Sequence, residues 1–450
     1  MASTYLSKSV GSINEKTFTV SFWVKRGKLA DEQHIFGNFV DGNNRTHLFF
    51  RNEDTFQVFQ NIGGTAHSCI TNAKFRDVNG WYHIVVAIDT TQATASNRCR
   101  IYVNGVEQSL DGPTYHNQNT NLSIRGTHYI GRYYGTNDHW FSGSLSHLHF
   151  IDGTNYDATA FGETDSTTGE WKIKTSPSVT YGTEGYFILK DGNSVTNQAG
   201  NSAGNFSVSG GTLTKTEDCP SNVFATVNPL NVPTSNAPTF ANGNTTSTSS
   251  TTNGPYKWGG CTTLGMTSGK FYCEAKATVD NTYSRNVIGI TGDSANIARA
   301  NVSILNGTHS WGYYSENGTV SGNGSGDLSG WNTAYTTGDI IMMALDLSNN
   351  KLYFGKNGTW LNSGVPTSGS TGTGAVSIIA ANTTNDGVYF FAQTDDTGTQ
   401  SPSKFEFNFG NGYFGTTAVS SAGTNASNNG IFEYDVPAGY TALSTKGLNL

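Results

Sequence analysis

Large apolar and small polar residues alternate along much of the first third of the chain. The segment 18–24 (FTVSFWV) shows this alternation, and 81–89 and 100–103 continue the set. A period of two residues is typical of a β-strand with one buried face. Asn104-Gly105 follows the last of these segments and favours a tight hairpin, because both turn positions adopt positive φ. The pattern therefore predicts antiparallel strands here.

A second set of apolar segments lies between residues 256 and 409, most clearly at 271–277 and 340–347. Between the two sets, residues 156–222 hold only short apolar clusters that Gly, Thr and Asp interrupt. A Ser/Thr-rich stretch at 233–254 favours an exposed loop. No segment of the chain keeps a 3.6-residue period over three turns.

Strands spaced by turns at about 8–12 residues predict β-sandwiches. We therefore expect an all-β protein with two antiparallel β-sandwich (jelly-roll) domains. The first occupies 1–155 and the second 223–450, which ends in a C-terminal tail. Residues 156–222 form a loop-rich connector that packs on both domains.

Composition excludes several classes of protein. Of the 450 residues, 12% are aromatic, which a disordered chain lacks, and 54 are glycine, which a long-helix protein avoids. The formal net charge is −7 and no Lys/Arg block stands out, so we expect no nucleic-acid partner. No apolar run approaches the ~20 residues of a membrane helix, and no signal peptide is evident at the N-terminus.

Five cysteines occur at wide spacings, with no CxxC motif. We expect free buried thiols, and a Cys261–Cys273 pair is the alternative. The cysteines are Cys69, Cys99, Cys219, Cys261 and Cys273.

Catalytic motifs are weak, and we expect no enzymatic activity. A retaining glucanase needs two flanking carboxylates. In laminarinase-like strands the acids follow the pattern Glu-x-Asp-x-x-Glu. The nearest match in this chain joins Glu163, Asp165 and Glu170, but the spacing to the third acid is wrong, and Thr168 occupies its position. His147 and His149 lie two apart on one predicted strand, without a second pair of metal ligands.

No cofactor is expected, although calcium is an open alternative. Asp41, Asp111 and Asp138 are loop acids, but no Asp-x-Asp-x-Asp cluster supports a calcium site from the residues themselves.

Ligand binding is favoured over catalysis. The segment 133–140 (YYGTNDHW) combines aromatic rings, on which sugar rings stack, with amide and acid groups that bond hydroxyls. Packing of Tyr133 and Trp140 in the core is the competing interpretation. The glycan-binding candidates are Tyr133, Tyr134, Asn137, Asp138, His139 and Trp140 in the first half, and Trp258, Tyr283, Arg285 and Trp331 in the second. Trp311 and Phe354 are expected in the second core.

Two family resemblances agree with this division. The first half resembles the concanavalin A-like sandwich of laminin-G and pentraxin type domains, whereas the second resembles the SPRY (B30.2-like) sandwich. The first is carried by 18–25 (FTVSFWVK), 81–85 (WYHIV), 100–105 (RIYVNG), 130–132 (IGR) and 141–145 (FSGSL). The second is carried by 269–274 (GKFYCE), 310–314 (SWGYY), 338–347 (GDIIMMALDL), 352–358 (LYFGKNG), 390–392 (FFA) and 407–410 (FNFG).

The order of pieces is similar to that of tailed-bacteriophage virion proteins. Their joining and closing segments resemble 161–164 (FGET), 168–171 (TGEW), 181–186 (YGTEGY), 218–230 (DCPSNVFATVNPL) and 436–443 (VPAGYTAL). The resemblance implies a virion structural protein, a tail fibre or a head or tail appendage.

Such a protein would be made in the host cytoplasm and displayed on the virion surface as a homo-oligomer. Its partners would be other virion proteins and a host cell-surface glycan, without membrane insertion. A capsid decoration, cement or fibre-connecting protein without its own ligand is the alternative, and a glycan-degrading enzyme is the third.

Overall fold

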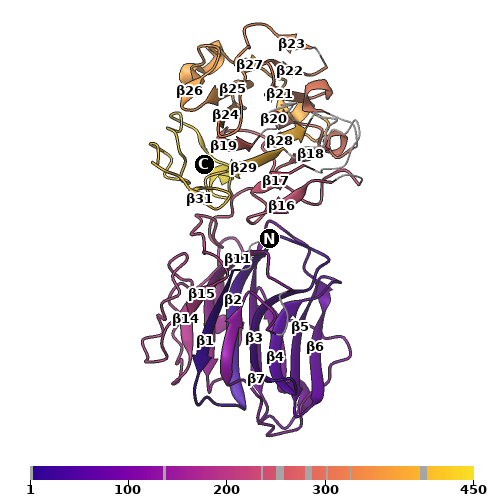
Figure 1. Ribbon diagram of the computed structural model, residues 1–450, viewed down its shortest axis with the longest axis vertical. Helices are drawn as coiled ribbons and strands as arrows, with labels where there is room; N and C mark the ends of the chain where they lie inside the picture. The colour runs from indigo at the N-terminus through magenta and orange to yellow at the C-terminus, as the bar shows by residue number, and fades with distance from the viewer. Residues whose placement is uncertain are drawn as a thin grey trace. The chain divides into compact units, whose positions relative to one another are not determined.

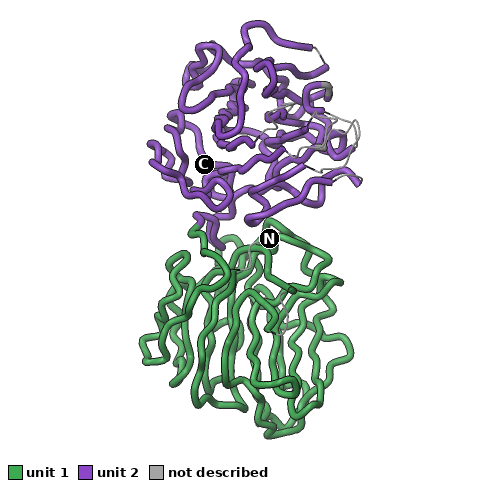
Figure 2. Tube along the Cα trace, in the orientation of Figure 1, with its two compact units in different colours: residues 1–215 green, residues 216–450 purple. Residues whose placement is uncertain are grey.

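Antiparallel strands make up most of the structure, as the alternation of residues predicts. The computed structural model describes residues 4–134, 138–234, 237–249, 258–278, 286–299, 303–324, 326–395 and 403–449. The chain divides into two units, residues 1–215 and 216–450 (Figure 2). Helical turns are short: α1 (Ser294–Ile297) and the 3₁₀ turns η1 (Ala95–Asn97), η2 (Ala158–Ala160), η3 (Ile304–Asn306), η4 (Pro366–Thr371), η5 (Ala381–Thr383) and η6 (Gly447–Asn449). None of the helices in these ranges has the length and apolar character that crossing a membrane requires.

The first unit is a sandwich of two antiparallel sheets (Figure 1). The seven-stranded sheet runs in the order β15 (Ser207–Ser209), β1 (Tyr5–Val10), β10 (Gly126–Ile130), β3 (Gln33–Asp41), β4 (Asn44–Phe50), β5 (Thr55–Ile62) and β6 (Thr65–Lys74). The six-stranded sheet runs in the order β14 (Tyr186–Ile188), β11 (Gly143–Asp152), β2 (Thr17–Arg26), β7 (Trp81–Asp89), β8 (Cys99–Val103) and β9 (Val106–Glu107). A small hairpin joins β12 (Gly162–Thr164) to β13 (Trp171–Ile173).

The second unit is also a two-sheet sandwich. Its nine-stranded sheet orders β16 (Thr239–Ala241), β17 (Thr246–Thr248), β29 (Lys404–Asn408), β19 (Lys270–Thr278), β24 (Ile340–Asp346), β25 (Lys351–Lys356) and β26 (Thr359–Trp360), with β27 (Val376–Ser377) beside β25 and β32 (Thr441–Ala442) beside β19. Its six-stranded sheet orders β18 (Trp258–Cys261), β28 (Phe390–Asp395), β20 (Asn286–Thr291), β21 (Ser310–Tyr314), β22 (Val320–Gly322) and β23 (Asp327–Leu328). β30 (Tyr413–Phe414) pairs with β31 (Thr417–Ala418).

The alternation predicted for residues 18–24 places one set of side chains in the first core. Phe18, Val20 and Phe22 on β2 are fully buried between the sheets. They pair across to Ile88, Val86 and Ile84 on β7. Aliphatic and aromatic pairs directly opposite one another stabilise neighbouring strands. The all-β, two-sandwich fold class is confirmed.

The predicted connector at 156–222 needs correction. Residues up to 215 belong to the first unit, and only 216–222 belong to the second. The reason is strand pairing: β14 extends the six-stranded sheet beside β11, and β15 extends the seven-stranded sheet beside β1. Tyr186 of β14 is fully buried in the first core.

The predicted C-terminal tail is part of the second sandwich. Phe432, Val436 and Tyr440 are buried against the outer face of the nine-stranded sheet. Glu274 on β19 anchors this segment, because its carboxylate accepts hydrogen bonds from the backbone N–H groups of Glu433 and Tyr434 at 2.9 and 2.8 Å.

Other sequence expectations are settled by this second core. Trp311 and Phe354 are buried in it, as expected. Cys273 lies there too, but Cys261 lies in a separate cluster with Ile297 and Ala392, so the alternative Cys261–Cys273 pair is wrong. Both are free thiols in the structure.

Buried histidines distinguish the first unit from the second. Burial lowers the pKa of His83 and of His116 to about 3, and that of His128 and of His147 to about 4. The unfolded chain restores an ordinary value near 6.5. The second unit contains a single histidine, His309. Acid should therefore act selectively on the first unit.

We expect the first unit to lose stability as the pH falls below about 6.5. The histidines bind protons in the unfolded state at such pH values, whereas the buried histidines of the folded state remain neutral. His83 and His116 should each lower the free energy of unfolding by about 2 kcal/mol at pH 5 relative to pH 7.5. Calorimetry at the two pH values should show the transition of the first unit moving further than that of the second. Equal shifts of both transitions would contradict this account.

Candidate binding site

The outer face of the seven-stranded sheet carries rings that the first core does not use. On β4, Leu48 and Phe50 point into the sandwich and are fully buried. Their neighbours His47 and Phe49 therefore point to the opposite face, because successive side chains of a strand alternate. Both are nevertheless almost inaccessible to solvent. Something must cover this side of the sheet.

A row of opposed residues crosses the face from strand to strand. Tyr129 on β10 lies opposite Gly37 on β3, Gly37 lies opposite His47, and His47 lies opposite Phe59 on β5. A Cβ atom at Gly37 would stand 2.8 Å from Nδ1 of His47. The missing side chain at position 37 thus makes room for the imidazole.

Residues 131–134 and 138–141 lie across this row. The backbone of His139 accepts a hydrogen bond from the amide of His34, at 3.1 Å. The Tyr133 ring sits 4.9 Å from the His34 ring and 5.0 Å from the His47 ring. Tyr134 stacks on Phe39. The described part of the predicted binding loop therefore packs on the sheet with its aromatic rings.

Arg132 holds the other end of this segment. Its guanidinium lies 4.5 Å from the Tyr5 ring, 5.2 Å from the Trp140 ring and 5.6 Å from the Tyr129 ring. A cation over aromatic faces is attracted to each of them. Tyr5, Tyr129, Tyr133 and Trp140 all remain partly exposed. We call the assembled surface the aromatic face, formed by Tyr5, His34, Phe39, His47, Phe49, Tyr129, Tyr133, Tyr134, His139 and Trp140.

Charged groups border the aromatic face at one place. Glu32 Oε1 lies 2.9 Å from Nε2 of His34 and 3.9 Å from Nε2 of His139. The hydrogen bond with His34 is the main cause that lowers the pKa of Glu32. Burial is the main cause that lowers the pKa of His34, so this imidazole is neutral and donates to the carboxylate. Asp138, whose side chain is 55% exposed, lies 3.6 Å from His139.

His47 is the least satisfied polar group of the aromatic face. Both ring nitrogens are buried, and neither has a hydrogen-bond partner among the described residues. Burial holds the pKa of His47 well below its ordinary range. A neutral imidazole in this setting contributes to the aromatic face as a flat, buried ring.

The structure brings together five of the first-half candidates. These candidates occupy positions 133–134 and 138–140, on or beside the aromatic face: Tyr133, Tyr134, Asp138, His139 and Trp140. None of the three large aromatic residues among them belongs to the first core. Asn137 lies outside the described residues.

Sequence reasoning missed the part of the site that the sheet provides. Tyr5, Glu32, His34, Phe39 and Arg132 are far apart in the chain or lie outside the chosen loop. One signal was available in the segment 47–50 (HLFF). Aromatic or apolar residues occupy both alternating sets of positions, which is typical of a strand covered on both faces rather than of one with a solvent-facing side.

Of the second-half candidates, Trp331 alone has a side chain that the structure describes. Trp331 lies on a loop, as expected, but it is 6% exposed and packs edge-on against Phe354 in the core. The prediction that it binds a glycan is wrong, because burial of the indole removes it from any ligand. Trp258 begins β18. Tyr283 and Arg285 lie outside the described residues.

The carboxylate run at 163–170 has a structural role. Lys172 lies 3.4 Å from Glu163 and 3.3 Å from Asp165. Asp165 also accepts the backbone N–H groups of Thr167 and Thr168, and hydrogen bonds from the backbone are the main cause that lowers its pKa to about 2. A carboxylate held in the charged form cannot serve as a general acid.

The buried contact between Ser21 and His83 likewise has the wrong histidine tautomer for nucleophilic catalysis. Trp171 Nε1 donates to Nδ1 of His83 at 3.0 Å, so the proton of the neutral imidazole is on Nε2. Nε2 lies 2.9 Å from Oγ of Ser21 and donates to it. His83 therefore cannot accept the proton of Ser21.

Among the residues that the structure describes, no group of three or more His, Cys, Asp or Glu side chains is placed to hold a metal ion. His149 instead pairs with the Tyr181 hydroxyl and His147 with the Ser146 hydroxyl. The carboxylate of Asp41 accepts hydrogen bonds from Asn43 and Asn44 in its own turn. Calcium remains a prediction without support from these contacts.

The comparisons with known proteins follow the same division of the chain. Residues 1–158 match the model of the concanavalin A-like lectin/glucanases superfamily. No curated protein matches. The first sandwich therefore contains a concanavalin A-like domain of laminin-G type.

Solved structures similar to parts of the chain include SPRY domains and a pentraxin. The SPRY domain of human HERC1 has 16% identity and a TM-score of 0.31, over 40% of this chain and 96% of that one. A heptameric SAP-like pentraxin from Limulus polyphemus has 16% identity and a TM-score of 0.27, over 34% and 71%. Domain 4 of AbnA, an extracellular arabinanase from Geobacillus stearothermophilus in complex with arabinotriose, has 20% identity and a TM-score of 0.27, over 33% and 67%.

We expect Gly37→Ala to destabilise the first unit by about 1–3 kcal/mol, because the new methyl group overpacks against the His47 ring. Gly42→Ala is the matched control, since a Cβ there meets nothing within 4 Å. Chemical denaturation measures both variants. In the His47→Ala background the cost of Gly37→Ala should fall by more than half, and an unchanged cost would show that the imidazole is not the obstacle.

Proposed function

We propose that this protein is a structural component of a bacteriophage virion, an appendage or fibre, that adheres to a host surface glycan through the aromatic face of its first sandwich. The observation that carries the binding part is the convergence of Tyr133, Trp140 and Tyr5 on one partly exposed surface. The virion part rests on the resemblance of the joining segments to those of tailed phages.

The chemistry of the aromatic face suits a sugar. The C–H faces of pyranose rings pack on aromatic side chains, and an aromatic ring buries a large apolar area with few rotatable bonds. Asp138, Glu32 and His139 stand beside the rings as hydrogen-bonding groups for hydroxyls. A concanavalin A-like domain supports this assignment, since its superfamily includes lectins.

The same surface is poorly equipped for glycan hydrolysis. Cleavage needs one carboxylic acid that stays protonated beside one carboxylate. Glu32 is held as a carboxylate by His34, and its pKa is lowered. Asp138 is a half-exposed side chain beside His139. These contacts favour binding without cleavage.

The proposal places the chain on the virion surface after its synthesis in the host cytoplasm. Its partners would then be other virion proteins and the glycan, and copies of the chain would associate as a homo-oligomer. The low fraction of charged residues, 13%, supports uncharged partners rather than nucleic acid.

We expect purified protein to bind host cells and their isolated polysaccharide, and Trp140→Ala and Tyr133→Ala each to weaken this binding by about tenfold or more. Tyr156→Ala is the matched control, because this partly exposed tyrosine packs on the outer side of the other sheet, near Phe161. Binding isotherms and the thermal stability of all variants should be measured together.

Each outcome decides between the classes of function. Absence of binding by the unaltered protein would favour an assembly or cement protein without a ligand. Release of reducing sugar from the polysaccharide would favour the enzyme. Equal loss in the Tyr156→Ala control would show that the aromatic face is not the site.

The virion part is tested by location. We expect antibodies against the first unit to label intact phage particles at an appendage, and a cryo-EM map to show the aromatic face open to solvent. An aromatic face covered by another virion subunit would overturn adhesion but keep the structural role. Absence of the chain from purified particles would overturn the virion assignment itself.

A further inference from the structure

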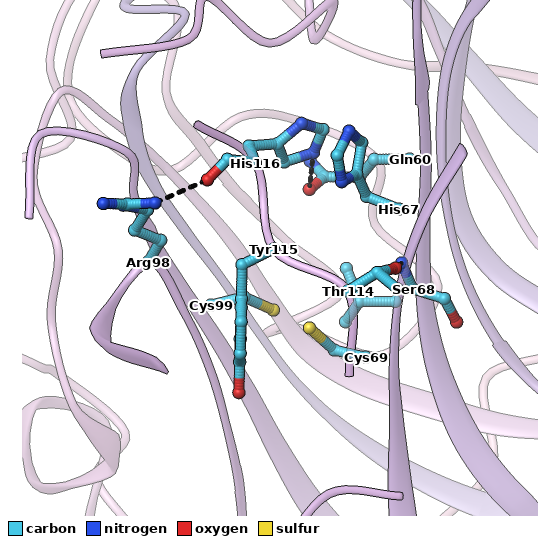
Figure 3. A pocket seen from close by; sticks show the side chains of 10 residues that line it. Gln60, His67, Ser68, Cys69, Arg98, Cys99, Thr114, Tyr115 and His116 are labelled. Atoms are coloured by element: carbon cyan, nitrogen blue, oxygen red, sulfur yellow. Dashed lines mark hydrogen bonds between the residues drawn. The ribbon is translucent and has the colours of Figure 1, made fainter. Parts of the chain in front are cut away.

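Two cysteines from different sheets meet inside the first sandwich. Cys69 lies on β6, at the edge of the seven-stranded sheet, and Cys99 begins β8 in the six-stranded sheet. They are 3% and 6% exposed and belong to the same core cluster. Figure 3 shows their sulfur atoms pointing toward one another. Both are thiols in the structure.

The surroundings of the pair keep the Cys99 thiol protonated. The two cysteines line a small cavity of about 10 Å³ together with Tyr115, His67 and His116 (Figure 3). The pKa of Cys99 is raised well above its ordinary value, chiefly by its interaction with the Cys69 thiol and then by burial. Burial lowers the pKa of His116 to about 3, so no imidazolium stands near to stabilise a thiolate. A reactive or catalytic cysteine needs the opposite setting.

The edge position gives the pair a structural purpose. β6 ends the seven-stranded sheet, and beyond it the segment 109–114 is attached by the isolated bridges Ser68–Thr114 and Thr71–Leu110 and by a few further hydrogen bonds rather than by a regular strand. A covalent link from β6 to β8 would close the sandwich at this edge. It would also restrict the unfolded chain over the span 69–99, which is how a disulfide stabilises a fold.

We propose that Cys69 and Cys99 form an inter-sheet disulfide when the chain folds in the presence of a low-molecular-weight disulfide such as oxidised glutathione. One cysteine thiolate attacks oxidised glutathione, which gives a mixed disulfide and releases one glutathione thiolate. The second cysteine thiolate attacks the protein sulfur of the mixed disulfide and releases the second glutathione thiolate. Two protein thiols are oxidised, one glutathione disulfide is reduced, and the two protons pass to the released thiolates.

The other three cysteines serve as internal comparators. Cys261 and Cys273 are buried in separate clusters of the second unit. Cys219 is partly exposed beside the Ser221 hydroxyl, at 3.3 Å. Neither burial alone nor exposure alone therefore predicts disulfide formation. The proposal depends on the sulfur atoms of Cys69 and Cys99 pointing toward one another (Figure 3).

The test is refolding of the full chain with and without a reduced/oxidised glutathione buffer. We expect the oxidised product to lose two titratable thiols and two hydrogen atoms in mass, and digestion to yield one linked peptide that contains Cys69 and Cys99. The melting temperature of the first unit should rise by roughly 5–10 °C, and reduction should reverse the rise.

Cys69→Ala and Cys99→Ala should each abolish the rise, whereas Cys261→Ala should leave it intact. If either of the first two variants fails to fold, peptide mapping of the unaltered protein still decides. Five titratable thiols after oxidative refolding, glutathione retained on Cys69 or Cys99, or a linkage to any other cysteine would overturn the proposal.

Discussion

A strand with apolar side chains on both faces must be covered on both sides, and this constraint organises both units. β4 directs Leu48 into the first core and Phe49 outward, and residues 131–134 and 138–141 lie over the outer face. On the other sheet, Val85 and Ala87 of β7 are covered by the region around Phe161. In each case a long connection supplies the second layer, because two sheets alone can bury only their inner faces.

The aromatic face is the place where the covering is incomplete. His34 and His47 are buried beneath residues 131–134 and 138–141, yet Tyr133 and Trp140 among these residues remain partly exposed. On the other sheet His83 is fully buried between Trp23 and Trp171, and its ring nitrogens are engaged by Trp171 and Ser21. His47, by contrast, is buried with neither ring nitrogen in a hydrogen bond among the described residues.

The sequence allowed the sandwiches to be predicted but only half of the candidate site. Alternation is a local signal, so β2 and β7 could be placed from residues 18–24 and 81–89. The loop candidates Tyr133 and Trp140 could also be found, because they are adjacent in the chain. Their sheet partners, such as Tyr5, come from strand order and register, which the sequence does not state. Trp331 shows the converse error, since a tryptophan in a Gly-rich stretch is as often buried as displayed.

The contacts that stabilise the fold also decide what chemistry it can perform. Three groups that resemble catalytic acids or bases are each held in one protonation state by their neighbours. Glu32 pairs with His34, Asp165 pairs with Lys172, and His83 is hydrogen-bonded to Trp171 and Ser21. Proton transfer requires a group whose two protonation states are both accessible near the working pH. In these three groups burial and hydrogen bonding fix one protonation state, a neutral imidazole or a charged carboxylate. Aromatic rings and hydrogen-bonding groups in a fixed protonation state are therefore what these three places offer to a ligand.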